Sequence, residues 1–431
     1  MLLALCTGIG LTELGRLQVL DVATFDGYHL LLGKRKEPKA TLIASMDAES
    51  LDLYPNTPLL FWGPHFAKAI QRLIDAGASC VALDFYLSIT PEQWMRTLGD
   101  QSAIPESLLD YDQTFDSVLS TGRVVLAAGP IRQQKAVSVP MPAREYLEAL
   151  PDGMGGIGLS NFLRDNDDRV RRLVPAYTGM QASAGANAQA VPQALRPPDP
   201  WWTLSALAIK KSVDDTAWGA QGGTTPYAPM VITYCGPPGT IPRLSLAALL
   251  REQELTPEEE SLVRGRVVFI GADFESFGDR QPTPYSKTLF GLGQRDMSSI
   301  EIHANIAETL LDSDRLRQVP LLVAACIWLP FMLLSAYASM HYSTLKITGA
   351  IDIALSLVMW LIGFAFFMKG ALLPQAGLYA AIGAFFTCEK VMRLVDDAET
   401  LQKATSVLDK RDSTRWLARV LSAVSGVGKN T

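Results

Sequence analysis

The chain is 431 residues long, enough for one large domain or two modest ones, and 48% of its residues are hydrophobic. Its mean hydropathy of +0.15 is high for a fully soluble protein, and the apolar excess lies after Pro320. The formal net charge is −6, and the C-terminal tail carries no net negative charge, so the rest of the chain is acidic. An acidic domain argues against nucleic acid as a partner.

Residues 1–19 contain a short apolar run, Met1–Leu11, which ends before Glu13 and Arg16. The run is too short to cross a bilayer core of about 30 Å by itself. It also lacks the charged start and the small-residue cleavage site of a signal peptide. We therefore expect either the end of a spanning helix that begins upstream of Met1 or a segment at the membrane interface.

Residues 20–316 alternate between strand and helix patterns. Short apolar runs predict strands, and longer segments with apolar residues at helical spacing predict helices. Strands are expected at 40–47, 79–88, 123–130, 230–236 and 266–273, with two more around a polar turn within 156–177. Helices are expected at 63–78, 114–122, 200–212 and 298–314. This alternation predicts an α/β domain with a mostly parallel sheet and covering helices.

Acidic residues follow several of these strands. Asp47 and Asp84 come at the carboxyl ends of two early strands, and Asp273, Glu275 and Asp279 follow a later one. In an open α/β sheet, ligands bind beyond the carboxyl ends of the strands. We therefore predict a ligand site for a divalent cation or a cationic ligand, with no other cofactor evident. The alternative is that Asp47 and Asp279 cap helices or brace turns.

Three further features have structural explanations that we prefer. The stretch "RDNDD" at 164–168 lacks the Gly and terminal Glu of a calcium loop, so we expect a β-turn with solvated charges. His303 could bind a ligand or respond to pH, but a core or helix-surface histidine is expected. Cys80 and Cys235 lie in strand-like stretches and are expected to be buried free thiols, although a disulfide is permitted outside the cytoplasm.

Residues 317–390 contain three apolar segments, at about 320–340, 347–368 and 371–388. Each approaches the length of roughly 20 residues that crosses a bilayer, which predicts an all-α membrane domain of three spanning helices. Lys and Arg are sparse between the segments and frequent after Cys388, which predicts a cytoplasmic C-terminus. Three spans then place residues 20–316 outside the cytoplasm.

The tail, residues 391–431, carries apolar residues at heptad spacing, Leu394, Leu401 and Leu408. A second apolar stripe, which includes Trp416 and Leu417, follows the polar stretch "DKRDSTR" at 409–415. We interpret the polar stretch as a break between two short helices. Because short helices are barely stable alone, we expect them to contact a partner protein or a second copy in a homodimer. The alternative is a basic segment on the inner leaflet.

Five sequence pieces occur in order before the apolar segments: "ATLIASMDAESL", "AKAIQRLIDAGASCVALDFYLS", "RDNDDRVRRLVPAY", "GRVVFIGADFESFGDRQPTP" and "IEIHANIAETLL". This ordered set resembles the type-2 CHASE domain, the cyclase- and histidine-kinase-associated sensory extracellular domain, over about residues 20–390. The resemblance implies the periplasmic sensory domain of a multi-pass receptor in the inner membrane of a bacterium. The ligands of such domains are generally unknown.

Receptors of this kind usually continue into a cyclase or kinase domain. Here 43 residues follow Cys388 (431 − 388), too few for a catalytic domain. No P-loop, HExxH, CxxC or GxSxG pattern occurs, so we predict a non-enzymatic sensor that signals to a separate cytoplasmic partner. Two alternatives stay open: a structural subunit of a larger membrane complex, and an extracytoplasmic metal-dependent hydrolase that uses Asp47, Asp84 and Asp279.

Overall fold

The computed structural model describes residues 2–13, 18–98, 110–129, 139–178, 200–213, 226–274, 280–286, 293, 295–342 and 344–427. It consists of two compact units. The first, here called the helical unit, contains Met1–Thr24 and Gln318–Thr431. The second, here called the α/β unit, contains Phe25–Arg317.

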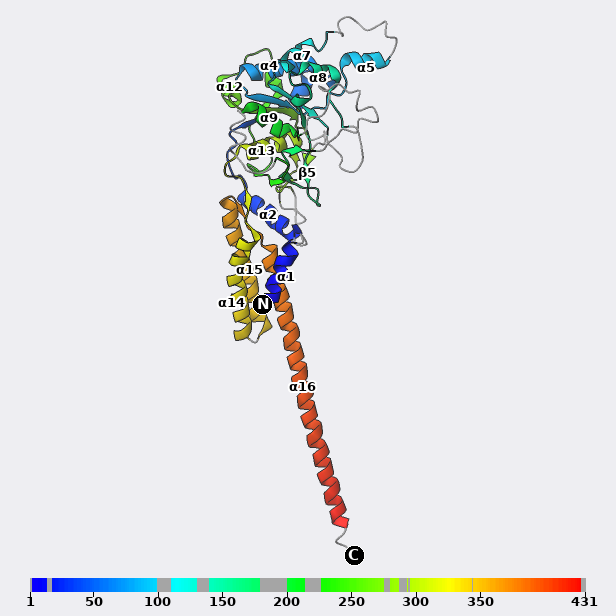
Figure 1. Cartoon of the computed structure of the whole chain (residues 1–431), viewed down its shortest axis with the longest axis vertical. Coiled ribbons are helices and arrows are strands. Elements are labelled where there is room, and N and C mark those ends of the chain that lie inside the picture. Colours follow the sequence, from blue (N-terminus) through cyan, green and yellow to red (C-terminus); the bar gives the residue numbers. More distant parts are fainter. Residues whose placement is uncertain are drawn as a thin grey trace. The chain divides into compact units, whose positions relative to one another are not determined.

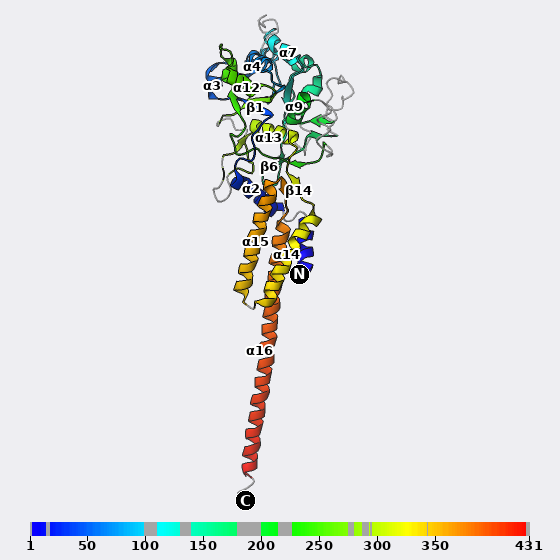
Figure 2. The ribbon, with the colours of Figure 1, turned by 90° about the vertical axis from the view of Figure 1, so that its left-hand side faces the viewer.

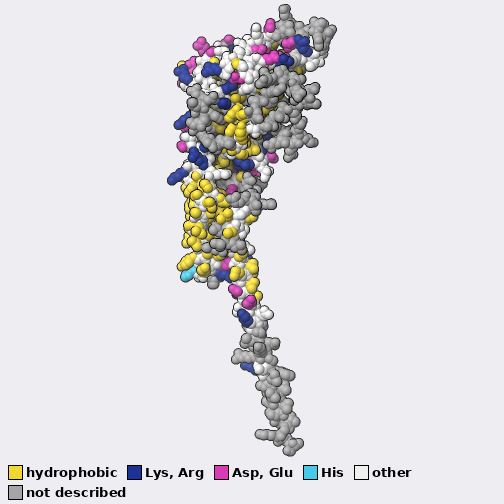
Figure 3. Space-filling view, viewed as in Figure 1, with side chains coloured by type: hydrophobic (Ala, Val, Ile, Leu, Met, Phe, Trp, Pro, Cys, Tyr) yellow, Lys and Arg dark blue, Asp and Glu magenta, His cyan; other side chains and the backbone are white. Residues whose placement is uncertain are grey.

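The helical unit is built from long helices, with α14 and α15 beside the first part of α16 (Figures 1 and 2). Its elements, with those at its boundaries to the α/β unit, are α1 (Leu2–Glu13), α2 (Gln18–Leu32), β14 (Arg317–Gln318), α14 (Leu321–His341), α15 (Leu345–Met368), β15 (Ala371–Leu372) and α16 (Ala376–Val427). In the described part of the chain, two stretches are long and apolar enough to cross a membrane, Leu321–His341 and Lys346–Met368. Figure 3 shows that hydrophobic side chains cover the visible face of these helices.

The third expected span, 371–388, has a different structure. Its first residues form β15, and the helix starts only at Ala376, as the beginning of α16. The short helix α1 packs along this part of α16, where Gly8 lies so close that a Cβ atom would be 2.3 Å from the carbonyl oxygen of Gly377. Small residues allow such close approach between helices in membranes.

The expected break at 409–415 is wrong. α16 is one helix of 52 residues that continues to Val427 and runs past the ends of α14 and α15 (Figure 2). The physical reason is that "DKRDSTR" is polar but contains neither Gly nor Pro, and polarity alone does not end a helix. The side chain of Leu394 is 60% exposed, whereas those of Leu401, Leu408, Trp416 and Leu417 lie outside the described residues.

A six-stranded sheet forms the centre of the α/β unit, and every pair of neighbouring strands in it is parallel. The strand order is β10–β1–β11–β2–β3–β4. The strands are β1 (Thr41–Met46), β2 (Cys80–Leu83), β3 (Val124–Ala128), β4 (Ile157–Leu159), β10 (Arg243–Ser245) and β11 (Val267–Ala272). The prediction of an α/β fold with a mostly parallel sheet is confirmed. Because β11 lies between β1 and β2, residues distant in sequence meet at one edge of the sheet.

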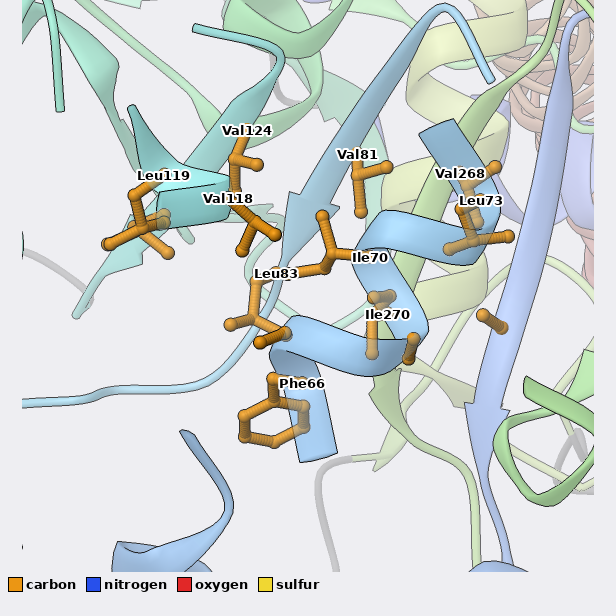
Figure 4. Packing of buried hydrophobic residues seen from close by; sticks show 14 of the residues in the cluster. Phe66, Ile70, Leu73, Val81, Leu83, Val118, Leu119, Val124, Val268 and Ile270 are labelled. Carbon is orange, nitrogen blue, oxygen red and sulfur yellow. The ribbon is translucent and has the colours of Figure 1, made fainter. Parts of the chain in front are cut away.

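Helices cover both faces of this sheet. On one face lie α4 (Gly63–Asp75) and α7 (Gln113–Leu119), and on the other lie α9 (Leu204–Ser212) and α13 (Ser299–Leu311). Figure 4 shows Phe66, Ile70 and Leu73 of α4 against the side chains of the strands. These three residues recur at helical spacing and are fully buried, and each contributes about 1.5–3 kcal/mol by burial. Their burial fixes α4 to the sheet.

The α/β unit also contains shorter elements. The helices are α3 (Ala48–Asp52), η1 (Leu59–Phe61), α5 (Pro91–Leu98), α8 (Arg144–Ala149), η3 (Gly153–Gly156), α11 (Leu246–Leu250) and α12 (Pro257–Val263). The strands are β5 (Leu163–Arg164), β6 (Val170–Leu173), β7 (Ala176–Tyr177), β8 (Trp201–Trp202), β9 (Met230–Val231), β12 (Arg280–Gln281) and β13 (Met297–Ser298).

Segment 156–177 is more divided than its pattern predicts. Its first apolar residues form β4, the last strand of the main sheet, while β5 and β6 form the hairpin around the polar turn. The expected strand at 230–236 is reduced to β9, which pairs with β6. Edge strand β10 was not predicted, because a strand of three residues that begins with Arg243 shows no alternation to recognise.

Candidate functional site

α13 is buried from Ser299 to Leu310. Most helices that are buried on all sides are apolar, yet α13 carries Glu301, His303, Asn305 and Glu308, none of which is more than 5% exposed. A buried polar group without a partner costs about 1–3 kcal/mol or more, so each of these side chains needs a partner in the surrounding elements. Their partners define the candidate site.

Glu301 lies in the first turn of α13. Its carboxylate accepts a hydrogen bond from the backbone N–H of Gly239 at 2.8 Å and forms an ion pair with Arg243, the first residue of β10. Burial raises the pKa of Glu301, and the charge of Arg243 and the backbone hydrogen bonds oppose that shift. The first turn of α13 is thereby attached to the edge strand of the sheet.

Asp273, one of the predicted site residues, pairs with two arginines. It directly follows β11 and its side chain is only 8% exposed. Arg243 contacts its Oδ2, and the guanidinium of Arg280, on β12, lies 3.4 Å from its Oδ1. Because both oxygens face guanidinium groups, Asp273 serves to orient arginines rather than to present a free carboxylate.

His303 is fully buried between the rings of Phe162 and Phe269. Its Nε2 lies 3.1 Å from Ser160 Oγ, and its Nδ1 lies 2.9 Å from Ser205 Oγ. The predicted site residue Asp84 has its Oδ2 at 3.9 Å from the same Nε2. In a Ser–His–Asp triad the carboxylate and the hydroxyl face opposite ring nitrogens. Here Ser205 and Asp84 do face opposite ring nitrogens, but the Asp84 oxygen is beyond hydrogen-bond distance and Ser160 Oγ already contacts the same Nε2. The fully buried ring therefore connects the ends of β2 and β4 to α9.

Asp47 caps α3. Its Oδ1 accepts hydrogen bonds from the backbone N–H of Ser50 at 3.0 Å and from Ser245 Oγ at 3.0 Å, and Ser50 completes a capping box. Such a cap stabilises a helix by about 0.5–2 kcal/mol. Helix capping, the alternative to ligand binding for Asp47, therefore accounts for its contacts.

The predicted acidic residues follow neighbouring strands but do not surround a common ligand. Asp273 N–H donates to Met46 O, and Asp84 N–H donates to Ile270 O, so the ends of β1, β11 and β2 are adjacent. Asp47, Asp84 and Asp273 nevertheless contact different partners. Glu275 and Asp279 lie outside the described residues. Within the described ranges, no group of three or more His, Cys, Asp or Glu is arranged to hold a metal ion.

The C-terminal half of α13 is attached to the start of β1. Glu308 Oε1 accepts three hydrogen bonds, from Ala40 N–H at 2.8 Å and from the N–H and Oγ1 of Thr41, both at 2.9 Å. One helical turn later, Asp312 pairs with Lys36 Nζ at 2.5 Å. Burial acts to raise the pKa of Asp312, but the hydrogen bond from Lys36 and other contacts lower it overall.

Lys36 and Asp312 stand on the two segments through which the chain enters and leaves the α/β unit. Lys36 follows α2, which begins in the helical unit, and Asp312 precedes the boundary at Arg317. Their ion pair therefore ties the entering segment to the leaving one. No local pattern indicated this pair, because its members are 276 residues apart.

A second ion network attaches the β5–β6 hairpin to α2. Arg171 is 3% exposed and contacts Asp26 at 2.7 Å, Asp165 at 2.9 Å and Asp167 at 2.6 Å. The predicted turn exists, with Asp168 at a φ of 61°. The charged residues Arg164, Asp167 and Asp168 of the turn are exposed, as predicted. What the prediction missed is that, beyond the turn, α2 supplies Asp26 as a buried partner for Arg171. Cys80 and Cys235 are buried free thiols.

His29 lies near the end of α2 and is 1% exposed. Its Nδ1 lies 3.0 Å from the carbonyl oxygen of Phe25, and its ring packs against those of Phe25 and Tyr285. Burial lowers the pKa of His29 to about 3, and the nearby charges of Arg35 and Arg171 act in the same direction. The imidazole is therefore neutral in the folded protein.

Comparison with known families gives one match. The family model for the CHASE2 domain matches residues 1–338. No curated protein and no solved structure matches the chain.

Replacing Glu308 with Ala should lower the free energy of unfolding of the α/β unit by about 2–5 kcal/mol, because two backbone N–H groups and a hydroxyl lose their acceptor. Urea unfolding of the full chain in detergent, followed by tryptophan fluorescence, measures the change. Glu258→Ala, at an exposed position in the first turn of α12, is the control and should change the value by about 0.5 kcal/mol or less. Equal effects for the two variants would show that the three hydrogen bonds do not anchor α13.

The lowered pKa of His29 makes a prediction about acid stability. The unfolded chain protonates this histidine near its ordinary pKa of 6.5, whereas the folded protein does so only near 3. Between these values the unfolded state binds more protons, so stability falls as the pH falls. His29→Phe keeps a ring and should reduce the slope by about 1.4 kcal/mol per pH unit between pH 6 and 4. Urea midpoints at a series of pH values test this, and parallel curves for the two proteins contradict it.

Proposed function

Because the chain belongs to the CHASE2 family, we propose that it is a membrane receptor whose α/β unit senses a signal outside the cytoplasm. CHASE2 is a sensory domain, and its family model covers most of the chain, including the whole α/β unit. The proposal places the protein in the inner membrane of a bacterium, with the α/β unit in the periplasm.

The observation that carries this proposal is the pairing along α13. The first turn of the helix contacts the edge strand β10 through Glu301, and its last turn contacts the start of β1 through Glu308. A signal that rearranges the ion pairs at the sheet edge changes the position of α13. Asp312 and the following residues pass that shift to the helical unit, as one arrangement of the domain is favoured over another.

We assign three spanning helices to the helical unit: α14, α15 and the first part of α16. The two candidate spans and α16 share a buried apolar cluster that includes Trp328, Met332, Met359, Leu378 and Ile382. The basic residues after Cys388 favour a cytoplasmic location for the end of α16.

We further propose that α16 contacts a cytoplasmic partner protein in trans or a second copy of the chain. Val391, Met392, Leu394 and Val395 are 51–67% exposed, although all are apolar. The sequence continues apolar residues at heptad spacing through Leu401 and Leu408, and Trp416 and Leu417 follow on the same helix. A long helix with an apolar stripe gains most of its stability from packing against another helix.

Reporter fusions test the membrane placement. A reporter joined after Asp314 should be active outside the cytoplasm, and one joined after Asp397 should be active in the cytoplasm, because an odd number of spans separates these sites. Each site is fused both to a reporter enzyme that is active only after export and to one that is active only in the cytoplasm, so the two readings check each other. Cytoplasmic activity after Asp314 would exclude the proposed sensor.

Deletion of residues 412–431 tests the role of α16. The shortened chain should insert and fold like the full chain but lose a co-purifying protein or its self-association, because part of the apolar stripe is gone. Affinity purification and light scattering of both forms, with the fusion after Asp314 as a control for insertion, measure the difference. If both forms retain the same partners and the same mass, the end of α16 is not the output surface.

A further inference from the structure

The N-terminus of α13 lacks the side-chain hydrogen bond that usually caps a helix. Ser298 occupies the N-cap position but makes no side-chain capping hydrogen bond. Its residue is 2% exposed, and its Oγ has no hydrogen-bond partner among the residues that the structure describes. A serine at this position ordinarily accepts a hydrogen bond from the first turn. A buried hydroxyl without a partner, at the positive end of a helix of 13 residues, is a donor available to an additional acceptor.

Arginines surround the same helix end. Arg280 stands directly opposite Ser298 in the antiparallel pair β12–β13, so the two side chains lie on the same face of that ladder. Arg243 reaches the first turn of α13 through Glu301. The Nε atoms of Arg243 and Arg280 are buried and have no hydrogen-bond partner in the described part of the chain.

The local electrostatics also favour an anion. Burial lowers the pKa of the Arg243 guanidinium, Glu301 opposes that shift, and the charges of Arg295 and Arg280 add to it. The positive charges thus crowd one another, even though Asp273 and Glu301 lie between them. An anion beside these guanidinium groups relieves that crowding.

We propose that the N-terminus of α13, with Ser298, Arg243 and Arg280, binds a small oxyanion, the phosphate or carboxylate group of the signal molecule. Helix N-termini bind anions through their N–H groups and dipole, and the planar fork of arginine matches phosphate and carboxylate. The site lies at the carboxyl edge of the sheet, where ligands bind in open α/β folds. The side chains of Arg243 and Arg280 are 25% and 17% exposed, so both are partly accessible from solvent.

This assignment reverses the charge of the ligand expected from the sequence. The carboxylates of Asp273 and Glu301 both pair with arginine, and their role is to hold the guanidinium groups in place. The assignment rests on the proposed sensor function, for which it names the class of ligand. An oxyanion competes with Asp273 and Glu301 for the arginines, which alters the ion pair that attaches the first turn of α13 to β10.

The test uses the full chain in nanodiscs of phosphatidylcholine, a zwitterionic lipid with no net charge. Inorganic phosphate and, separately, acetate are titrated against chloride at constant ionic strength, and binding is followed by calorimetry and by the thermal midpoint. A saturable rise in the midpoint is expected with at least one of the two oxyanions. The stronger of the two identifies the group as phosphate or carboxylate.

Arg280→Gln should weaken binding roughly tenfold or more, and Ser298→Ala roughly severalfold, because each removes a hydrogen-bonding group from the site. Arg266→Gln is the matched control. Arg266 precedes β11 at the opposite edge of the sheet, where it hydrogen bonds to Thr41 O, and its replacement should leave binding unchanged.

Absence of saturable binding by both oxyanions, or equal affinity in wild type and Arg280→Gln, overturns the proposal. If Arg280→Gln does not fold, Ser298→Ala decides the matter, because its hydroxyl makes no hydrogen bond that folding would lose. This outcome can be distinguished from failure of the sensor proposal. If the reporter fusions show the expected topology but no oxyanion binds, only the ligand class is rejected. If an oxyanion binds but the α/β unit lies in the cytoplasm, only the sensor function is rejected.

Discussion

The requirement that every buried polar group be paired governs the arrangement around α13. An apolar helix at this place would pack against the sheet by shape alone and would tolerate small shifts. Glu301, His303 and Glu308 instead require partners at defined positions on β10, near β2 and β4, and before β1. Because leaving any one of them unpaired costs about 1–3 kcal/mol or more, α13 has few acceptable positions. A helix with few acceptable positions is suited to switching between two of them.

The sheet topology supplies those partners. With β11 inserted between β1 and β2, the residues after the three strands are adjacent, although β11 follows β2 by more than a hundred residues. The polar side chains of α13 thus meet groups from widely separated parts of the chain. Contacts of this kind couple the position of α13 to β10, to the start of β1 and to the end of β4.

Much of the fold could be predicted from the sequence. The runs that became β1, β2, β3 and β11 are short and apolar, and they are buried on both faces, as parallel strands between helix layers are. The candidate site could not be derived in the same way. Asp273 follows its strand as expected, but its ionic partners Arg243 and Arg280 come from β10 and β12, which are too short to show a pattern. The charge of the proposed ligand was inferred from those arginines.

Other differences have a similar origin. Arg171 lies in a stretch of mixed charge that is typical of a solvated turn, and only the approach of α2, with Asp26, makes it a buried network. α16 continues through its polar stretch because local composition permits a helix there, whereas the expected break relied on polarity alone. In each case the sequence showed the local character of the segment, and tertiary partners or backbone preferences decided its role.

The Lys36–Asp312 ion pair has a mechanical consequence. The chain crosses between the two units twice, once within α2 and once at Arg317. Without this ion pair and the Glu308 hydrogen bonds to Ala40 and Thr41, a displacement of α13 would act only on the second crossing. The ion pair braces one against the other, so a force on α13 is shared by both crossings. Under the proposed sensor function, two chain segments held together in this way would turn together, so a shift of α13 would act on the entering segment as well as on the leaving one.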